Sequence, residues 1–476
     1  MRTGDVLKGL ALNLALPAEL LRPLLRHREA GAKAMSLRTD LPRELVEEIL
    51  ASGDDRLARA LAVNPALPDG VRRSLATHRE PRVRTALTAH AASLPPDVLA
   101  TLGSDADADV RKFLAQCAEV PSGVRFRLAD DPDPRVRQEL ATSWVTAPED
   151  VRRRLLTDPE PTVRKAACST YSLRLAHPAP PSDLHEALLA DPATRTGVVA
   201  YLDPLTPEMA AALAADPDME VREAVAAHPQ LPPELRDALA RRRGGQEPVL
   251  CAEILVREDT PDALRAEIHA YLTAGAARLE SEEDVFCQVA LLDLQFRTVE
   301  WVRADPLPHV DSPYPCFRHS AAAGGPLPAE AVARLLDDED QYVRLVTVRH
   351  HGADLDPSAV ERVERAHKDT RKPADRPSDR YTYPPAYLRR FATDPDPRIR
   401  ELAPRDQDLP AALAEELATD PEARVRRAVA DHPRVPVPAL LALLSDDDPQ
   451  TAEAAGRNRS LPVSEMERII AAKRRE

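Results

Sequence analysis

The chain has 476 residues, with 78 Asp and Glu against 64 Lys and Arg, so its formal net charge at pH 7 is −14. This charge opposes general nucleic-acid binding, which needs a clustered basic surface, although it leaves room for a local basic groove. Five scattered cysteines without a Cys-x-x-Cys pair are typical of a reduced, intracellular protein, and no segment approaches the ~20 apolar residues of a membrane span. We therefore expect a cytoplasmic protein with no membrane partner.

A short stretch, seen clearly at Asp131-Pro-Asp-Pro-Arg-Val-Arg137, returns along most of the chain. Its valine recurs at Val83, Val110, Val136 and Val163, at intervals of 27, 26 and 27 residues. A unit of this size cannot bury its own apolar face, so neighbouring copies must stack and share one core. The sequence predicts an all-α, right-handed α-solenoid of roughly 26-residue, two-helix repeats, which can form one elongated array.

The first helix of each unit is expected to begin at a proline that usually follows leucine, as in Leu94-Pro-Pro-Asp-Val-Leu-Ala-Thr-Leu102. Proline is tolerated in the first helical turn, because the N–H groups there have no partner within the helix. Leu94, Val98 and Leu102 then share one face, at i, i+4 and i+8. This face predicts the part of the helix that packs into the core.

The second helix is expected to start again after Asp131-Pro-Asp-Pro, with Asp133 as the cap and Pro134 in the first helical position. Val136, Leu140 and Ala141 would then point toward the core. A following His-Pro or Asn-Pro pair, as at His228-Pro229, ends the helix, because the residue before proline is driven out of the α region.

The pattern Val221-Arg-Glu-Ala-Val-Ala-Ala-His-Pro-Gln-Leu-Pro-Pro-Glu-Leu235 resembles the leucine-rich repeat variant family, an α-solenoid similar in style to HEAT repeats. The resemblance covers about residues 10 to 240 and 325 to 470. It implies a right-handed superhelix of alternating α and 3₁₀-type helices. The family's founding member carries an iron–sulfur cluster on N-terminal cysteines, but this chain has no Cys before Cys117, so no cofactor is expected.

In chain order, three segments are predicted: a repeat array at 1–240, a divergent centre at 241–325, and a second array at 326–476. One unit of the first array carries an insertion around residues 168–180. The centre contains a longer helix from Val285 to Val302. The second array contains a long irregular loop at 367–391, and loops of this length in compact arrays are often functional.

An Asp and an Arg six residues apart recur in the repeats and are interpreted as a structural ladder between successive layers, not as a basic stripe. An arginine fork would bridge a carboxylate and helix-end groups. The ladder residues are Asp131, Arg137, Asp158, Arg164, Asp216, Arg222, Asp394, Arg400, Asp420 and Arg426.

Rings and arginines gather in the two irregular stretches of a chain that otherwise has few aromatic residues. Exposed rings and arginines are common binding hot spots, so a partner-binding role is proposed for them. The alternative is that the rings fill gaps left by irregular packing, or lie on a solvated loop; stacking on bases is a third interpretation. The residues are Trp301, Tyr314, Arg380, Tyr381, Tyr383, Tyr387 and Arg389, with Arg371 and Lys372 nearby.

Cys316, His319, His350 and His351 are ligand-type residues, but nothing in their spacing makes them converge on a metal. No phosphate loop, catalytic triad or paired-carboxylate motif is evident. The sequence favours a non-enzymatic scaffold whose concave face binds a protein or peptide of unknown identity. The alternatives are a nucleic-acid-binding HEAT-like protein, and an enzyme or metal site in the centre.

Overall fold

A computed structural model describes residues 3–117, 119–169, 177–368 and 376–472. The chain packs as two compact units. Unit 1 combines Met1–Ala166 with Pro384–Glu476, and unit 2 is Ala167–Tyr383. The three segments expected from the sequence are a different division, which stays a prediction. The expected insertion at 168–180 lies largely outside the described residues, as do Arg371 and Lys372.

The N-terminal part of unit 1 consists of short helices, and its last helix crosses the unit boundary. These are α1 (Thr3–Leu10), α2 (Ala18–Leu25), α3 (Arg28–Leu37), α4 (Arg43–Ser52), α5 (Asp55–Ala62), α6 (Asp69–Ala76), α7 (Pro81–Leu87), η1 (Thr88–Ser93), α8 (Pro96–Leu102), α9 (Ala108–Ala115), α10 (Ser122–Ala129), α11 (Pro134–Ser143), α12 (Glu149–Leu156) and α13 (Pro161–Cys168).

The C-terminal part of unit 1 follows the same plan. Its helices are α27 (Pro385–Phe391), α28 (Pro397–Arg400), η7 (Ala403–Arg405), α29 (Ala411–Ala418), α30 (Ala423–Ala430), α31 (Val437–Leu443), α32 (Pro449–Arg457) and α33 (Val463–Ala472).

Unit 2 mixes short repeat helices with two longer ones, α20 and α21. Its helices are η2 (Ser182–Leu184), α14 (His185–Ala190), α15 (Arg195–Val199), α16 (Pro207–Ala214), α17 (Met219–Ala227), α18 (Pro233–Ala240), α19 (Glu247–Leu255), α20 (Asp262–Arg278), α21 (Glu282–Phe296), α22 (Glu300–Ala304), η3 (Leu307–His309), α23 (Pro315–Ala322), α24 (Ala329–Leu336), α25 (Gln341–His351), η4 (Gly352–Asp354), α26 (Pro357–Ala366) and η6 (Pro377–Asp379).

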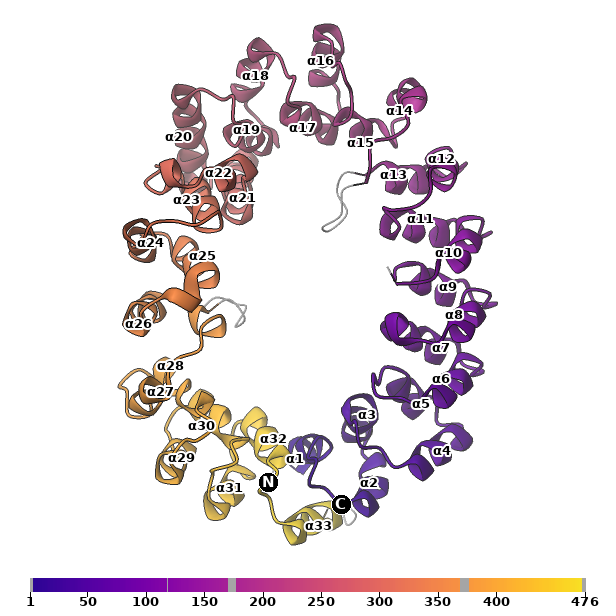
Figure 1. The fold of residues 1–476 in the computed structure, drawn as a ribbon, viewed down its shortest axis with the longest axis vertical. Helices are drawn as coiled ribbons and strands as arrows, with labels where there is room; N and C mark the ends of the chain where they lie inside the picture. The colour runs from indigo at the N-terminus through magenta and orange to yellow at the C-terminus, as the bar shows by residue number, and fades with distance from the viewer. Residues whose placement is uncertain (1–2, 118, 170–176, 369–375, 473–476) are drawn as a thin grey trace. The chain divides into compact units, whose positions relative to one another are not determined.

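The fold is an all-α repeat solenoid, and the described residues contain no strand. Each regular repeat consists of two helices, and these pairs of helices lie side by side along the chain (Figure 1). In unit 1 the second helices form one row, in which α3, α5, α7, α9 and α11 each contact the next. Both helices of these repeats are α-helices, whereas 3₁₀ turns occur as short additional segments.

The local signals of the second helix act as predicted. Asp133 is the N-cap of α11, and its carboxylate accepts a hydrogen bond from the Arg135 N–H at 2.9 Å. Pro134 occupies the first turn, and Val136, Leu140 and Ala141 are buried. The first helix differs slightly from the expectation, because Pro95 is the N-cap of α8 and Pro96 enters the first turn.

The predicted long helix of the centre is only partly correct. A capping box formed by Ser281 and Asp284 starts α21 at Glu282, before the expected Val285. The helix ends at Phe296, and the separate α22 follows from Glu300. The extended backbone of Arg297, at φ −77° and ψ 131°, accounts for the break.

The residue that follows the second helix binds the layer before it. The side-chain amide of Asn64 donates to the carbonyl oxygens of Met35 and Arg38 at 2.7 and 2.8 Å. Asn458 donates in the same way to Ala430 and His432, at 2.9 and 3.0 Å. Each asparagine thus satisfies backbone groups at the end of a neighbouring helix that would otherwise be buried without a partner.

In unit 1 the N-terminal and C-terminal repeats stack on each other in the same way as neighbouring repeats do. Helix α1 packs against α32, and α2 contacts α33, as Figure 1 shows where the N and C labels meet. Asn13 donates to the carbonyl oxygens of Gly456 and Asn458 at 3.1 and 2.8 Å. The C-terminal repeat therefore takes the place of the layer that would precede α1. We refer to this junction as the terminal seam.

Two glycines allow the helices of the terminal seam to approach closely. A Cβ atom on Gly9 would lie 2.0 Å from the Glu453 carbonyl oxygen, and one on Gly456 would lie 2.6 Å from that of Val6. Both distances are too short for any side chain. The seam accordingly requires glycine at both positions.

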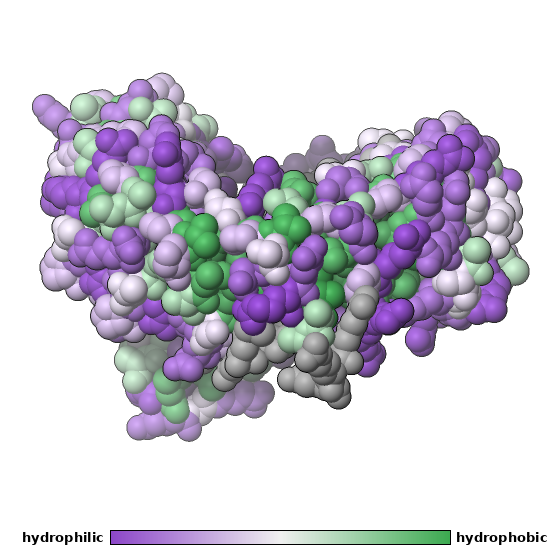
Figure 2. Space-filling view, turned by 90° about the horizontal axis from the view of Figure 1, so that it is seen from below, coloured by the Kyte–Doolittle hydropathy of each residue, from purple (hydrophilic) through white to green (hydrophobic). Residues whose placement is uncertain are grey.

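Charged and polar side chains cover much of the face drawn in Figure 2, and they separate its apolar patches from one another. Within the described residues, no helix has the length and hydropathy needed to cross a membrane.

Candidate functional site

The recurrent arginines link successive layers, as Arg137 illustrates. Its Nη1 donates to the carbonyl oxygen of Asp131 in its own repeat at 2.6 Å. Its Nε and Nη2 donate to both carboxylate oxygens of Asp158 in the next repeat, at 2.7 and 2.9 Å. Arg137 therefore binds the backbone of the aspartate six positions earlier. It also forms a bidentate ion pair with the aspartate of the following repeat.

The same bidentate or single contact recurs in both units. The pairs are Arg84–Asp105, Arg111–Asp131, Arg137–Asp158, Arg195–Asp216, Arg318–Asp338, Arg400–Asp420 and Arg426–Asp446. Backbone contacts six positions apart also join Arg164 to Asp158, Arg222 to Asp216, Arg400 to Asp394 and Arg426 to Asp420.

Several of the aspartates that pair with these arginines have a lowered pKa. Burial raises the pKa of Asp158, but the hydrogen bonds from Arg137 and from the Glu160 N–H outweigh it, so the pKa lies below its ordinary value. The pKa values of Asp420 and Asp446 are lowered in the same way, by Arg400 and Arg426. These carboxylates are paired with arginines that could otherwise have formed a basic stripe.

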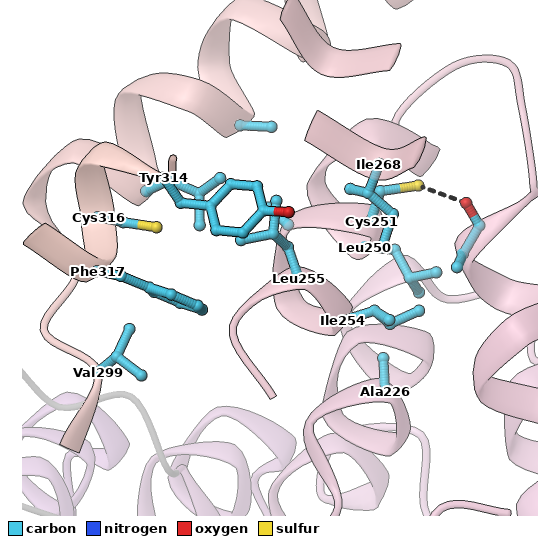
Figure 3. Packing of buried hydrophobic residues seen from close by; sticks show 14 of the residues in the cluster. Ala226, Leu250, Cys251, Ile254, Leu255, Ile268, Val299, Tyr314, Cys316 and Phe317 are labelled. Atoms are coloured by element: carbon cyan, nitrogen blue, oxygen red, sulfur yellow. Dashed lines mark hydrogen bonds between the residues drawn. The ribbon is translucent and has the colours of Figure 1, made fainter. Parts of the chain in front are cut away.

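Trp301 and Tyr314, the two candidate rings of the first irregular stretch, are packing residues. Tyr314 is only 8% exposed and meets Phe317 edge to face at 5.5 Å between ring centroids. Trp301 donates its indole N–H to the Val256 carbonyl oxygen at 2.9 Å and also packs edge to face on Phe317. Figure 3 shows Tyr314 and Phe317 inside the apolar cluster, beside Leu255. The expectation that the Tyr314 ring is exposed is wrong, because the ring packs into the apolar cluster of unit 2.

Described residues of the second irregular stretch bind the buried Glu364 of α26. Arg376 donates through Nε to the buried carboxylate of Glu364 at 2.8 Å, and the same carboxylate accepts from the Ser378 N–H at 2.8 Å. Tyr381 meets Tyr383 edge to face at 4.9 Å. Tyr383 is only 3% exposed, so the expectation of an exposed ring is also wrong there. Arg380 lies on the surface.

Tyr387 and Arg389 lie on α27 in unit 1. The Tyr387 ring is edge-on to Phe391 at 6.3 Å and lies beneath the Arg390 guanidinium at 4.7 Å. Arg389 Nε donates to the carboxylate of Asp406 at 2.7 Å. Arg389 therefore takes part in a contact of the ladder type. A partner-binding role for this set of residues stays a prediction, and few of its members present a ring to solvent.

Among the Cys and His candidates for a metal site, Cys316 is buried, His319 and His351 are half-buried, and His350 is exposed. Burial raises the pKa of the Cys316 thiol to about 12, which keeps it protonated near neutral pH. The His351 ring nitrogen Nε2 contacts the Ala322 carbonyl oxygen at 3.2 Å. Within the described ranges, no three His, Cys, Asp or Glu side chains are grouped to hold a metal ion.

The clearest surface feature is one that the sequence analysis missed, on α21. Four large apolar side chains at i, i+4, i+7 and i+11 face solvent along it, and we call them the α21 stripe. They are Val285, Val289, Leu292 and Phe296, which are 49%, 45%, 54% and 58% exposed. The opposite face of the helix, with Cys287, Ala290 and Leu294, is buried in the core of unit 2.

A groove of about 640 Å³ runs beside the α21 stripe. Val289 and Leu292 form one of its walls, and His269 and Thr273 of α20 line it as well. Tyr314 contributes to its lining, although little of its ring is exposed. At the far end of the stripe, the Phe296 ring packs edge to face on Tyr342 of α25, at 5.2 Å between centroids. The stripe thus continues onto the neighbouring repeat.

Carboxylates from α17, α19 and α21 gather at the C-terminal end of the stripe. Asp293 of α21 and Glu253 of α19 both bind Arg297, at 2.8 and 2.5 Å. Burial raises the pKa of Glu223 of α17 to about 7, the negative charge of Glu253 adds to the rise, and Arg297 opposes it. We call Glu223, Glu253 and Asp293 the carboxylate cluster. Their positions in the chain are 30 and 40 residues apart, so no local motif marks them.

Neither family models nor curated proteins give a match to this chain. Among solved structures, one match is a karyopherin bound to the extreme C-terminus of a protein phosphatase, with 14% identity, a TM-score of 0.27, and coverage of 96% of this chain and 55% of that one. The chain thus spans about half of the karyopherin's length. A second match is an engineered protein with 16% identity and a TM-score of 0.14, covering 99% of both chains. The assignment to the helical repeat class rests on the helices described above.

Proposed function

We propose that the chain is a non-enzymatic repeat scaffold that binds a protein or peptide, and that α21 carries the binding surface. The supporting observation is the α21 stripe, whose four neighbouring apolar side chains are about half exposed. Single exposed apolar residues are normal on a protein surface, whereas a contiguous row beside a groove is typical of an interaction site. Burying such a row stabilises a complex by ~25 cal/mol for each Å² removed from water.

The rest of the architecture fits this role. The Asp–Arg ladder and the buried asparagines hold the repeats in register, so side chains on the helix surfaces can vary without loss of the core. The ladder arginines Arg111, Arg137 and Arg400 are paired with aspartates, which argues against their use as a phosphate-binding stripe. We further propose that the repeats are of the leucine-rich repeat variant type and that the protein acts in the cytoplasm, both on the sequence patterns alone.

An unbiased peptide selection tests the proposal. A displayed library of random peptides is selected on the immobilised full chain and then on a Val289→Ser/Leu292→Ser variant, in which both changes lie at exposed positions. Enriched peptides should bind the wild-type chain at least about tenfold more tightly than the variant. A Leu307→Ser variant is the control, since Leu307 is 51% exposed but lies outside the α21 stripe. A lack of enrichment, or equal binding to all three chains, would contradict the proposal.

A further inference from the structure

The α21 stripe and the carboxylate cluster form one continuous surface in unit 2. Asp293 follows Leu292 directly and precedes Phe296 by less than one turn, so an acidic group lies within the apolar row. Arg297, the next residue after α21, joins Asp293 to Glu253 on the adjoining helix. A ligand that covers Leu292 and Phe296 therefore meets these carboxylates at the same time.

The charges at this end of the surface are not balanced. The charged groups with the largest effect on Glu223 are Glu253 of α19, Arg297, Glu220 of its own helix, and Asp293 of α21. One guanidinium thus faces several carboxylates. At the other end of the stripe, Glu282 is exposed, and Arg278 is already bound to Asp284 at 2.8 Å. Both ends of the apolar row are consequently acidic.

The spacing of the stripe also indicates the shape of its ligand. From Val285 to Phe296 the row follows a helix over about three turns, roughly 16 Å. Amphipathic helices bind such rows through apolar residues at i, i+3 or i+4, and i+7. The groove on one side of the row supplies the concave surface on which a second helix can lie.

We infer that the α21 stripe and its groove bind a basic amphipathic helix, which places its apolar face on the stripe and sets Lys or Arg side chains against the carboxylate cluster. This inference rests on the proposed function and adds the chemical class of the partner. A cation at the cluster relieves the repulsion among its carboxylates, whereas an acidic helix increases it. Binding also favours the ionised form of Glu223, so it should be accompanied by the release of a proton near neutral pH.

The test uses the full chain and three labelled synthetic peptides of about 14 residues, long enough to cover the stripe. One has Leu at i, i+4, i+7 and i+11 with Lys at most other positions. The second has Glu in place of Lys, and the third has the composition of the first in scrambled order. Fluorescence anisotropy should show the ordered Lys peptide binding at least about tenfold more tightly than either of the others.

Two variants separate the apolar and the charged contributions. Val289→Ser/Leu292→Ser keeps the charge of the chain, so a loss of about tenfold or more in affinity for the Lys peptide identifies the stripe as its site. Glu223→Gln removes one titrating group. The affinity of the wild-type chain should increase severalfold from about pH 6 to pH 8, because Glu223 loses its proton in that interval, and the Glu223→Gln chain should lack this increase.

The outcomes distinguish the two claims. If the Lys and Glu peptides bind equally and both are lost in the serine variant, the surface binds peptides but the basic partner is wrong. If the scrambled Lys peptide binds as well as the ordered one, attraction to the net charge of −14 explains the result and the inference fails. Self-association of the chain that is lost in the serine variant would show that a second copy occupies the stripe, which also overturns the inference.

Discussion

Asn13 donates its side-chain amide to the backbone carbonyl of Asn458 at 2.8 Å, although 445 positions separate the two residues in the chain. Asn458 makes the same kind of bond to His432, in the layer before its own. The C-terminal repeat thus packs against the N-terminal repeat in the position of its preceding layer. Asn13 is fully buried, so the loss of this bond would leave polar groups without partners in the core.

The terminal seam should open when Gly9 is replaced by alanine. The new Cβ would lie 2.0 Å from the Glu453 carbonyl oxygen, and because that atom belongs to the backbone of α32, the helices must separate. Spin labels on α2 and α33 should then report a longer and broader distance distribution than in the wild-type chain. Gly70→Ala in α6 is the control, since a Cβ there meets nothing within 4 Å. An unchanged distribution in the Gly9→Ala chain would contradict the described contact.

Arg137→Ala should destabilise the protein by about 1–3 kcal/mol, because it leaves the buried carboxylate of Asp158 without its bidentate partner. The matched control is Arg135→Ala on the same helix. Arg135 pairs with Asp133 at an exposed position, where screening by solvent leaves an ion pair little effect on stability. Chemical unfolding would measure both changes. Equal effects of the two substitutions would show that the ladder adds nothing beyond ordinary surface pairing.

The ladder also predicts a loss of stability in acid. The pKa values of Asp158, Asp420 and Asp446 are lower in the folded chain than the value of about 3.9 expected for an unfolded Asp. Their contribution is therefore present above about pH 4 and is lost as the pH falls through the folded values. Melting temperatures recorded from about pH 7 to pH 3 should fall most steeply below about pH 4. In an Asp158→Asn chain, which starts less stable, the fall should be shallower.

Tyr383→Ala should lower the stability of unit 2 by about 3–5 kcal/mol, the range for removing a large buried ring. Tyr383 is 3% exposed and packs on Tyr381, so the expectation here is a loss of folding stability and not a loss of partner capture. Arg380→Ala, at an exposed neighbouring position, should leave the melting temperature unchanged. A Tyr383→Ala chain that melts like the wild type would restore the interpretation of this ring as a contact residue.

The repeat itself could be predicted because each of its signals is local. Asp133 caps and Pro134 starts a helix wherever they occur, and Val136 and Leu140 define its buried face by spacing alone. The six-residue spacing of Asp and Arg is likewise a local signal. The sequence did not reveal that Arg137 reaches the carboxylate of Asp158, since that contact spans 21 positions and depends on how two layers stack.

The candidate site could not be predicted, because α21 is apolar on nearly all sides. Cys287, Ala290 and Leu294 face the core, whereas Val289 and Leu292 face solvent, and periodicity does not tell one face from the other. Which face is covered depends on α19, α20 and α23, which pack against α21. Rings drew attention to the centre, but Tyr314 is largely buried at the base of the groove and Trp301 is bonded to the Val256 carbonyl oxygen.

The terminal seam changes where unit 1 can fray. In an open repeat array, the first and last repeats each have a neighbour on one side only, so they unfold locally more often than the middle of the array. Here α1 packs between α3 and α32, and α32 packs between α30 and α1. Helices α1 and α32 are consequently interior layers of the stack. Their backbone amides should exchange with solvent as slowly as those in the middle of the unit.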